Sequence, residues 1–110
     1  MRLASIDLGT NTILLLIADF AADGTMTVVR DEQIIARLGK GVDANRRITA
    51  ETFTRVLSLL QRLKATAESQ GATKVVASAT SALRDATNGV EFVRDVKGRL
   101  GLEIEILSGQ

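Results

Sequence analysis

Two residue types that carry much of enzyme chemistry are missing from the sequence, because it has no cysteine and no histidine. Without cysteine the chain can form no disulfide and offers no thiol nucleophile. Without histidine it has no Ser–His or Cys–His catalytic pair, and most kinds of zinc site are excluded as well. Any acid–base chemistry must therefore use carboxylates, lysines or a metal-bound water.

The sequence also lacks a strong excess of charge and a long hydrophobic run. Its formal net charge is +1, and its lysines and arginines are scattered, so we expect no duplex nucleic acid as a partner. The most apolar stretch, TILLLIADFAA, is too short to cross a bilayer and is interrupted by Asp19. The first residues lack the pattern of a signal peptide. We therefore expect a cytoplasmic protein without a membrane partner.

What remains is the composition of an ordinary globular domain. The chain has 110 residues, of which 45% are hydrophobic and 25% charged. This size and this balance are typical of one folded domain and not of a disordered segment. The sequence shows no internal repeat, low-complexity tract or linker, so residues 1–110 are expected to form a single domain.

The first third of the sequence predicts an antiparallel meander of three strands. These strands are expected over Arg2–Leu8, Thr12–Phe20 and Met26–Asp31. The second is apolar on both faces, which is typical of a buried central strand. Asp23-Gly24, between the second and third strands, is a hairpin turn signal. Residues 33–47 show no helical or strand periodicity and contain two glycines, which predicts a long loop. Such loops are uncommon in small domains and often have a function.

The rest of the sequence alternates helices with strands. Thr49 is expected to cap a helix of about 20 residues that ends at Gly71. A strand follows over Thr73–Ala79, and the segment TSALRDA then reads as a short helical turn. Asn88-Gly89-Val90-Glu91 fits a capping box, so a second helix is predicted from Asn88 to about Leu100. The alternating segment LEIEILS predicts a half-exposed final strand.

The predicted order is strand-strand-strand-helix-strand-helix-strand, which indicates an α/β layer fold. Two strands joined by a helix in one sheet are expected to run parallel, so the last two strands should do so. Because the meander is antiparallel, the whole sheet is expected to be mixed.

The segment IDLGTNT connects the first two strands and admits two interpretations. Aspartate and threonine favour turns, so the segment can be an ordinary hairpin turn. Alternatively, Gly9 takes a positive φ, and the successive N–H groups of the turn form an anion-binding nest. Asp7, at the strand end, would then hold Mg²⁺ between its carboxylate and a phosphate.

Four segments, in this order, carry a resemblance to a known family: ASIDLGTNTILLLIAD, IARLGKGVD, ASATSALRDATNG and IEILSGQ. They resemble the exopolyphosphatase/guanosine pentaphosphate phosphatase family, within the superfamily of actin and the sugar kinases. Together they cover essentially the whole chain. The resemblance implies a ribonuclease H-like (actin-like ATPase) fold, with a five-stranded mixed sheet and helices packed on it.

The resemblance also implies which residues bind phosphate. The family's first phosphate loop matches this sequence at Asp7, Gly9, Thr10, Asn11 and Thr12. Its second segment, near the substrate cleft, matches at Thr80, Ser81 and Arg84.

Two of the basic residues have a second interpretation. The planar guanidinium of Arg84 suits phosphate oxygens, but it can also be a surface charge paired with Asp85 or Asp95. Lys40, in a loop that lies beside the cleft in the family, can steer polyanions or be an ordinary exposed lysine.

The resemblance implies a phosphatase that removes the terminal phosphate of polyphosphate or of guanosine pentaphosphate, with Mg²⁺ assisting the attack of water. The family continues beyond the equivalent of Gln110 with the segment thought to supply the catalytic base, and then with a second domain. We therefore expect an N-terminal domain that supplies one phosphate loop, contains no catalytic base and is inactive alone. Its expected partners are the substrate and that second domain, and a homodimer is possible.

Two other functions stay open on the sequence alone. One is the ATP-binding domain of a sugar or acid kinase of the same superfamily, which would transfer phosphate to a hydroxyl group instead of water. The other is a non-catalytic regulatory domain, which would bind neither ATP nor polyphosphate.

Overall fold

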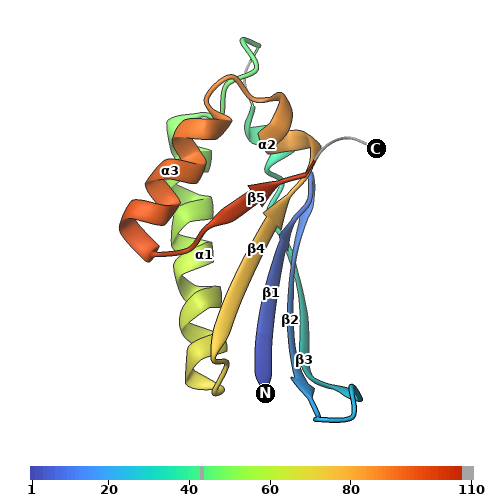
Figure 1. The fold of residues 1–110 in the computed structure, drawn as a ribbon. Helices are drawn as coiled ribbons and strands as arrows, with labels where there is room; N and C mark the ends of the chain where they lie inside the picture. The colour runs from blue at the N-terminus through green and yellow to red at the C-terminus, as the bar shows by residue number, and fades with distance from the viewer. Residues whose placement is uncertain (43, 108–110) are drawn as a thin grey trace.

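The strands and helices alternate along the chain almost as the sequence predicts (Figure 1). The structure is a computed structural model, and it describes residues 1–42 and 44–107. Its strands are β1 (Arg2–Leu8), β2 (Thr12–Phe20), β3 (Met26–Ile35), β4 (Lys74–Ala79) and β5 (Ile104–Ile106). Its helices are α1 (Ala50–Ser69), α2 (Ser81–Asp85) and α3 (Gly89–Leu100), with a 3₁₀ turn, η1, at Gly39–Gly41.

The five strands form one mixed sheet in the order β3-β2-β1-β4-β5. β1 pairs antiparallel with β2, and β2 with β3, which confirms the predicted meander. β4 pairs parallel with β1 on one side and with β5 on the other, as expected for strands joined through helices. The predicted α/β fold with a five-stranded mixed sheet is therefore confirmed.

The helices α1 and α3 pack on the same face of the sheet and enclose the core (Figure 1). The side chains of β1 and β2 alternate between this buried face and the opposite one, which is the period that a half-covered strand requires. The helix α1 presents buried residues at helical spacing, and the rings of Phe53 and Phe92 meet edge to face with centroids 4.8 Å apart. Each fully buried apolar side chain of this core stabilises the fold by about 1.5–3 kcal/mol.

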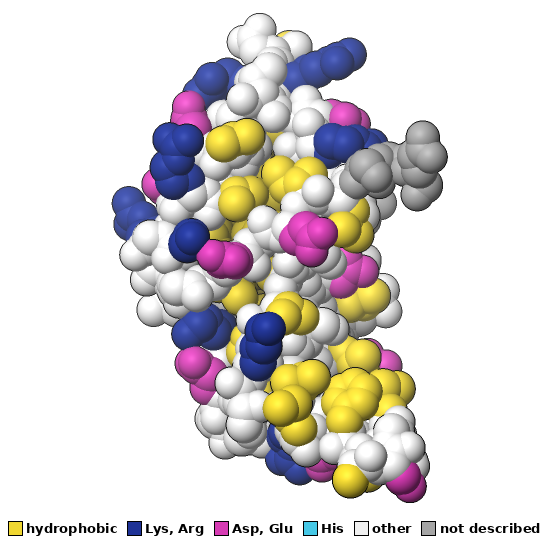
Figure 2. Space-filling model, in the orientation of Figure 1, with side chains coloured by type: hydrophobic (Ala, Val, Ile, Leu, Met, Phe, Trp, Pro, Cys, Tyr) yellow, Lys and Arg dark blue, Asp and Glu magenta, His cyan; other side chains and the backbone are white. Residues whose placement is uncertain are grey.

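The opposite face of the sheet is open in the part of the chain that the structure describes. Phe20 and Val76 on this face are 38% and 46% exposed. Together with Leu3 and Leu16 they line an apolar hollow of about 210 Å³. Figure 2 shows hydrophobic side chains gathered over the lower end of the sheet.

The predicted ends of the two long helices are confirmed. The Thr49 hydroxyl accepts a hydrogen bond from the backbone N–H of Thr52, so it caps α1. Gly71 and Gly101 follow the two helices with φ of 89° and 68°, the left-handed conformation that glycine adopts without strain. Gly24 in the β2–β3 turn also has a φ of 89°, which confirms the predicted hairpin signal.

Three strand boundaries differ from the prediction. β3 does not end at Asp31 but continues to Ile35, because Ile34 and Ile35 pair with the first residues of β2. The predicted loop is therefore shorter. The final strand covers only Ile104–Ile106, and β4 begins at Lys74.

The predicted capping box at the start of α3 is wrong. Asn88 precedes α3, but its side chain makes no hydrogen bond to the first turn of that helix. Its amide instead accepts from the N–H of Ile48 at 2.8 Å and donates to the carbonyl of Ile48 at 3.1 Å. Asn88 is only 5% exposed, and a buried amide must have such partners, so it pairs with the peptide group that it meets.

None of the described helices is long and apolar enough to cross a membrane.

Candidate phosphate-binding site

The turn between β1 and β2 directs its carbonyl groups into the protein. The Thr12 carbonyl accepts a hydrogen bond from the N–H of Gly9, and the Thr10 carbonyl accepts from Gly39, each at 2.8 Å. The Asn11 carbonyl accepts from the N–H groups of residues 36 and 37. Within the described chain, the backbone N–H groups of Thr10 and Asn11 have no partner of their own. These two neighbouring N–H groups are therefore free to donate to a bound ligand.

Gly9 has a different role from the one predicted. The residues with positive φ do not include it, so the expected left-handed conformation is wrong. A Cβ atom on Gly9 would lie 3.0 Å from the carbonyl oxygen of Thr12, closer than side chains normally approach. The glycine therefore permits the tight closure of the turn.

The first residues of α2 meet this turn from the other side. In the parallel pairing of β1 with β4, Leu8 lies opposite Ala79, so the two strands end together. The N–H of Thr80 donates to the Leu8 carbonyl at 3.3 Å, and the hydroxyls of Thr10 and Ser81 are 3.0 Å apart. The structure thus brings together two predicted segments that are 71 residues apart in the sequence.

Asp7 lies near the end of β1 with its side chain on the open face of the sheet. It is exposed, and within the described chain its carboxylate has neither a hydrogen bond nor an ion pair. Its neighbours across the sheet are Leu14 on β2 and Ser78 on β4. No cluster of three metal-ligating side chains occurs among residues 1–42 and 44–107. A lone free carboxylate still suits Mg²⁺, which is often held by one or two carboxylates together with water and substrate phosphates.

Arg84 lies at the end of α2, where its Nε is 3.4 Å from a carboxylate oxygen of Asp85. The pairing with Asp85 that the alternative interpretation predicts is therefore present in the structure. This single contact is long, and the two side chains are 35% and 64% exposed. An exposed pair of this kind contributes little to stability and can exchange its partner for a phosphate.

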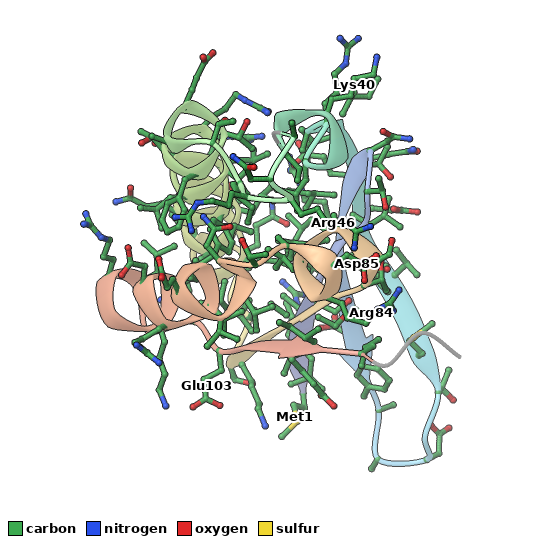
Figure 3. All side chains as sticks on the ribbon, turned by 90° about the horizontal axis from the view of Figure 1, so that it is seen from above. Met1, Lys40, Arg46, Arg84, Asp85 and Glu103 are labelled. Carbon is green, nitrogen blue, oxygen red and sulfur yellow. The ribbon has the colours of Figure 1, made fainter. Side chains whose placement is uncertain are left out.

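Lys40, on η1, is exposed, and Figure 3 shows its side chain pointing away from Arg84. The neighbouring Gly39 is closer to the site, because a Cβ atom there would lie 2.4 Å from Cγ2 of Thr10. Asp43 and residues 108–110, which end two of the segments that carry the family resemblance, lie outside the described residues.

Sequence reasoning missed Arg46 and a hollow of about 320 Å³ beside the turn. Thr10, Gly39 and Ser81 line this hollow on one side, and Arg46 and Asp85 also face it. The adjacent Arg46-Arg47 in a loop was the available signal. The contacts of that loop with Thr87 and Asn88, between α2 and α3, depend on the tertiary fold, so the sequence alone could not place it.

A larger hollow, of about 730 Å³, lies between α1 and α3. Its charged lining residues are of both signs, for example Arg94 and Asp95. We place the candidate site at the β1–β2 turn instead, because the turn carries free backbone donors and its Thr10 hydroxyl meets the hydroxyl of Ser81.

Comparison with known proteins shows which family the chain resembles. The sequence pattern of the Ppx/GppA phosphatase family matches residues 16–110. Exopolyphosphatase 1 of Mycobacterium tuberculosis is 32% identical over the whole chain, and exopolyphosphatase 2 of the same organism is 39% identical over 98% of it. The crystal structure of the Aquifex aeolicus member of the Ppx/GppA family superimposes on 99% of the chain with a TM-score of 0.90 and 31% identity.

The chain spans about a third of the length of these proteins, namely 32% and 36% of the two exopolyphosphatases and 35% of the Aquifex chain. Over that third, the chain matches the sequence pattern of the family, the sequences of two exopolyphosphatases and the fold of a family member. The chain therefore belongs to the Ppx/GppA phosphatase family.

Proposed function

We propose that this chain is the phosphate-binding domain of a phosphatase that hydrolyses the terminal phosphoanhydride of inorganic polyphosphate or of guanosine pentaphosphate. The observation that carries the proposal is the contact of the β1–β2 turn with the start of α2, through the hydroxyls of Thr10 and Ser81. Relatives named exopolyphosphatases support the substrate class.

Each group of the site has a role in holding a terminal phosphate. The N–H groups of Thr10 and Asn11 donate to its oxygens, and the hydroxyls of Thr10 and Ser81 can rotate to donate as well. Arg84 releases Asp85 and places two parallel N–H donors on the phosphate. Donors that are held in place before the reaction need no reorganisation when charge develops on these oxygens, and this lowers the barrier.

Asp7 is the residue that would hold Mg²⁺ at this site. When bound there, the ion would neutralise part of the charge of the transferred phosphate group. Without a cation the exposed carboxylate would repel a phosphate held by the neighbouring turn. Asp7 is therefore expected to make phosphate binding depend on Mg²⁺.

Isothermal titration calorimetry of this chain with tripolyphosphate, guanosine pentaphosphate and ATP, each with and without Mg²⁺, tests the proposal. We expect tripolyphosphate or the pentaphosphate to bind more tightly than ATP and to bind best with Mg²⁺. In the Asp7→Asn variant the dependence on Mg²⁺ should disappear, whereas Asp31→Asn, which changes an exposed aspartate on β3, should behave like the parent. Preferential binding of ATP would favour a kinase, and no binding of any ligand would favour a non-catalytic domain.

A further inference from the structure

Arg46 is an arginine in a backbone conformation that arginine seldom adopts. Its φ is 59°, in the left-handed region that side chains with a Cβ atom disfavour. A conformation of this kind persists only where the surrounding structure holds it.

Two neighbouring residues at the start of α3 provide that hold. The N–H of Thr87 donates to the carbonyl of Arg46 at 2.7 Å. Two residues further along, the peptide groups of Ile48 exchange two hydrogen bonds with the buried amide of Asn88. The backbone of Arg46 is therefore held by two of the residues that connect α2 to α3, and this fixes the position from which its side chain extends.

From that position Arg46 faces the hollow beside the phosphate turn. The hollow is also lined by Thr10, Ser81 and Asp85. Figure 3 shows Arg46 next to Asp85, with Arg84 on the same side of the molecule. Asp85 is the acidic side chain of this lining, and its carboxylate is paired with Arg84. Among the residues that the structure describes, the guanidinium of Arg46 forms no ion pair, so it is available to a bound anion.

We propose that Arg46 binds the second phosphate of a linear phosphoanhydride whose terminal phosphate is held by the β1–β2 turn. This inference rests on the proposed function and adds a determinant of substrate choice to it. The hollow continues from Thr10 and Ser81 to Arg46, so a chain of phosphates that starts at the turn runs toward the guanidinium. Orthophosphate, which has no second phosphate, gains nothing from Arg46. The residue therefore selects phosphate chains over their product.

The test measures the dissociation constants of tripolyphosphate and orthophosphate for three variants of this chain. Arg46→Asn removes the charge but tolerates a positive φ, and Arg46→Lys keeps the charge. Arg99→Gln removes an exposed arginine on α3, remote from the turn, and is the control. Thermal melting of each variant verifies that the fold is kept.

We expect Arg46→Asn to weaken tripolyphosphate binding about five- to tenfold, the loss of one charge-assisted contact in a partly exposed site. Orthophosphate binding should stay within about twofold of the parent. The slope of log Kd for tripolyphosphate against log salt concentration should become shallower, because one ionic contact is lost. Arg46→Lys should recover most of the affinity, and Arg99→Gln should match the parent.

Each other outcome overturns a particular statement. If Arg46→Asn binds tripolyphosphate as tightly as Arg99→Gln does, Arg46 is no ligand, and the proposed function stands without it. An equal loss for orthophosphate would place Arg46 at the terminal phosphate and remove its role in selection. If the parent chain binds neither ligand, the proposed function itself fails, and this inference fails with it.

Discussion

Replacing Asn88 by alanine tests how the loop of Arg46 is attached to the rest of the domain. The Asn88 amide forms two hydrogen bonds with the backbone of Ile48, and both residues are buried, at 5% and 4% exposure. Alanine can replace neither bond. The N–H and the carbonyl of Ile48 would both lose their partner.

The expected cost follows from those two groups. Leaving a buried backbone donor or acceptor unpaired costs about 1–3 kcal/mol, so the two groups freed by Asn88→Ala should lower the free energy of unfolding by about 2–6 kcal/mol. For a domain near this size, roughly 4 °C of melting temperature corresponds to 1 kcal/mol, which predicts a drop of about 8–24 °C. Small domains have about 5–15 kcal/mol in total, so this one side chain contributes a large part of the stability.

Urea denaturation followed by circular dichroism measures this effect, with Gln61→Ala on the exposed face of α1 as the control. The control should lie within about 0.5 kcal/mol of the parent. A loss below about 1 kcal/mol for Asn88→Ala would show that the amide of Asn88 does not hold the loop and does not fix the position of Arg46.

Three further changes test other parts of the structure. Gly9→Val places a side chain against the opposite carbonyl of the turn, so it should cost about 1–3 kcal/mol in urea denaturation and weaken tripolyphosphate binding; an unchanged free energy of unfolding would refute the tight turn. Gly101→Ala should destabilise by about 1 kcal/mol because its φ is 68°, whereas Gly98→Ala, with open space around it within α3, should stabilise slightly in the same measurement. The hydrogen bond from Arg2 lowers the pKa of Asp19, so the stabilisation is present above about pH 4 and is lost as the pH falls through the lowered pKa. Melting temperatures from pH 6 to pH 2 should therefore fall less steeply in Asp19→Asn than in the parent. If the melting temperatures of both proteins fall in parallel, the Arg2–Asp19 pair does not stabilise the fold.

Local sequence features predict most of the fold because they depend on neighbours in the chain. The alternation of buried and exposed residues in β1 and the glycines after α1 and α3 are properties of this kind. The pairing of Asn88 with Ile48 was not predictable in the same way, because it joins residues 40 positions apart. A motif that suggests a cap cannot show that a stronger partner lies elsewhere.

The candidate site was likewise predictable from the sequence only in part. The family resemblance indicated both phosphate segments, and the structure brings the predicted Thr10 and Ser81 together. The role of Gly9 was predicted wrongly, because a glycine in a turn can serve either a positive φ or a close contact. Arg46 was missed, since a positive φ at an arginine is set by tertiary contacts and has no signature in the sequence.

The central claim is that the β1–β2 turn and the start of α2 form one phosphate site. Its most direct test is a titration of the ¹⁵N-labelled chain with tripolyphosphate and Mg²⁺, followed by amide chemical shifts in two-dimensional NMR spectra. We predict that the largest shifts occur at Thr10, Asn11 and Ser81. Shifts centred on Phe53 and Arg94, in the larger hollow between α1 and α3, or no shifts at all, would contradict the account.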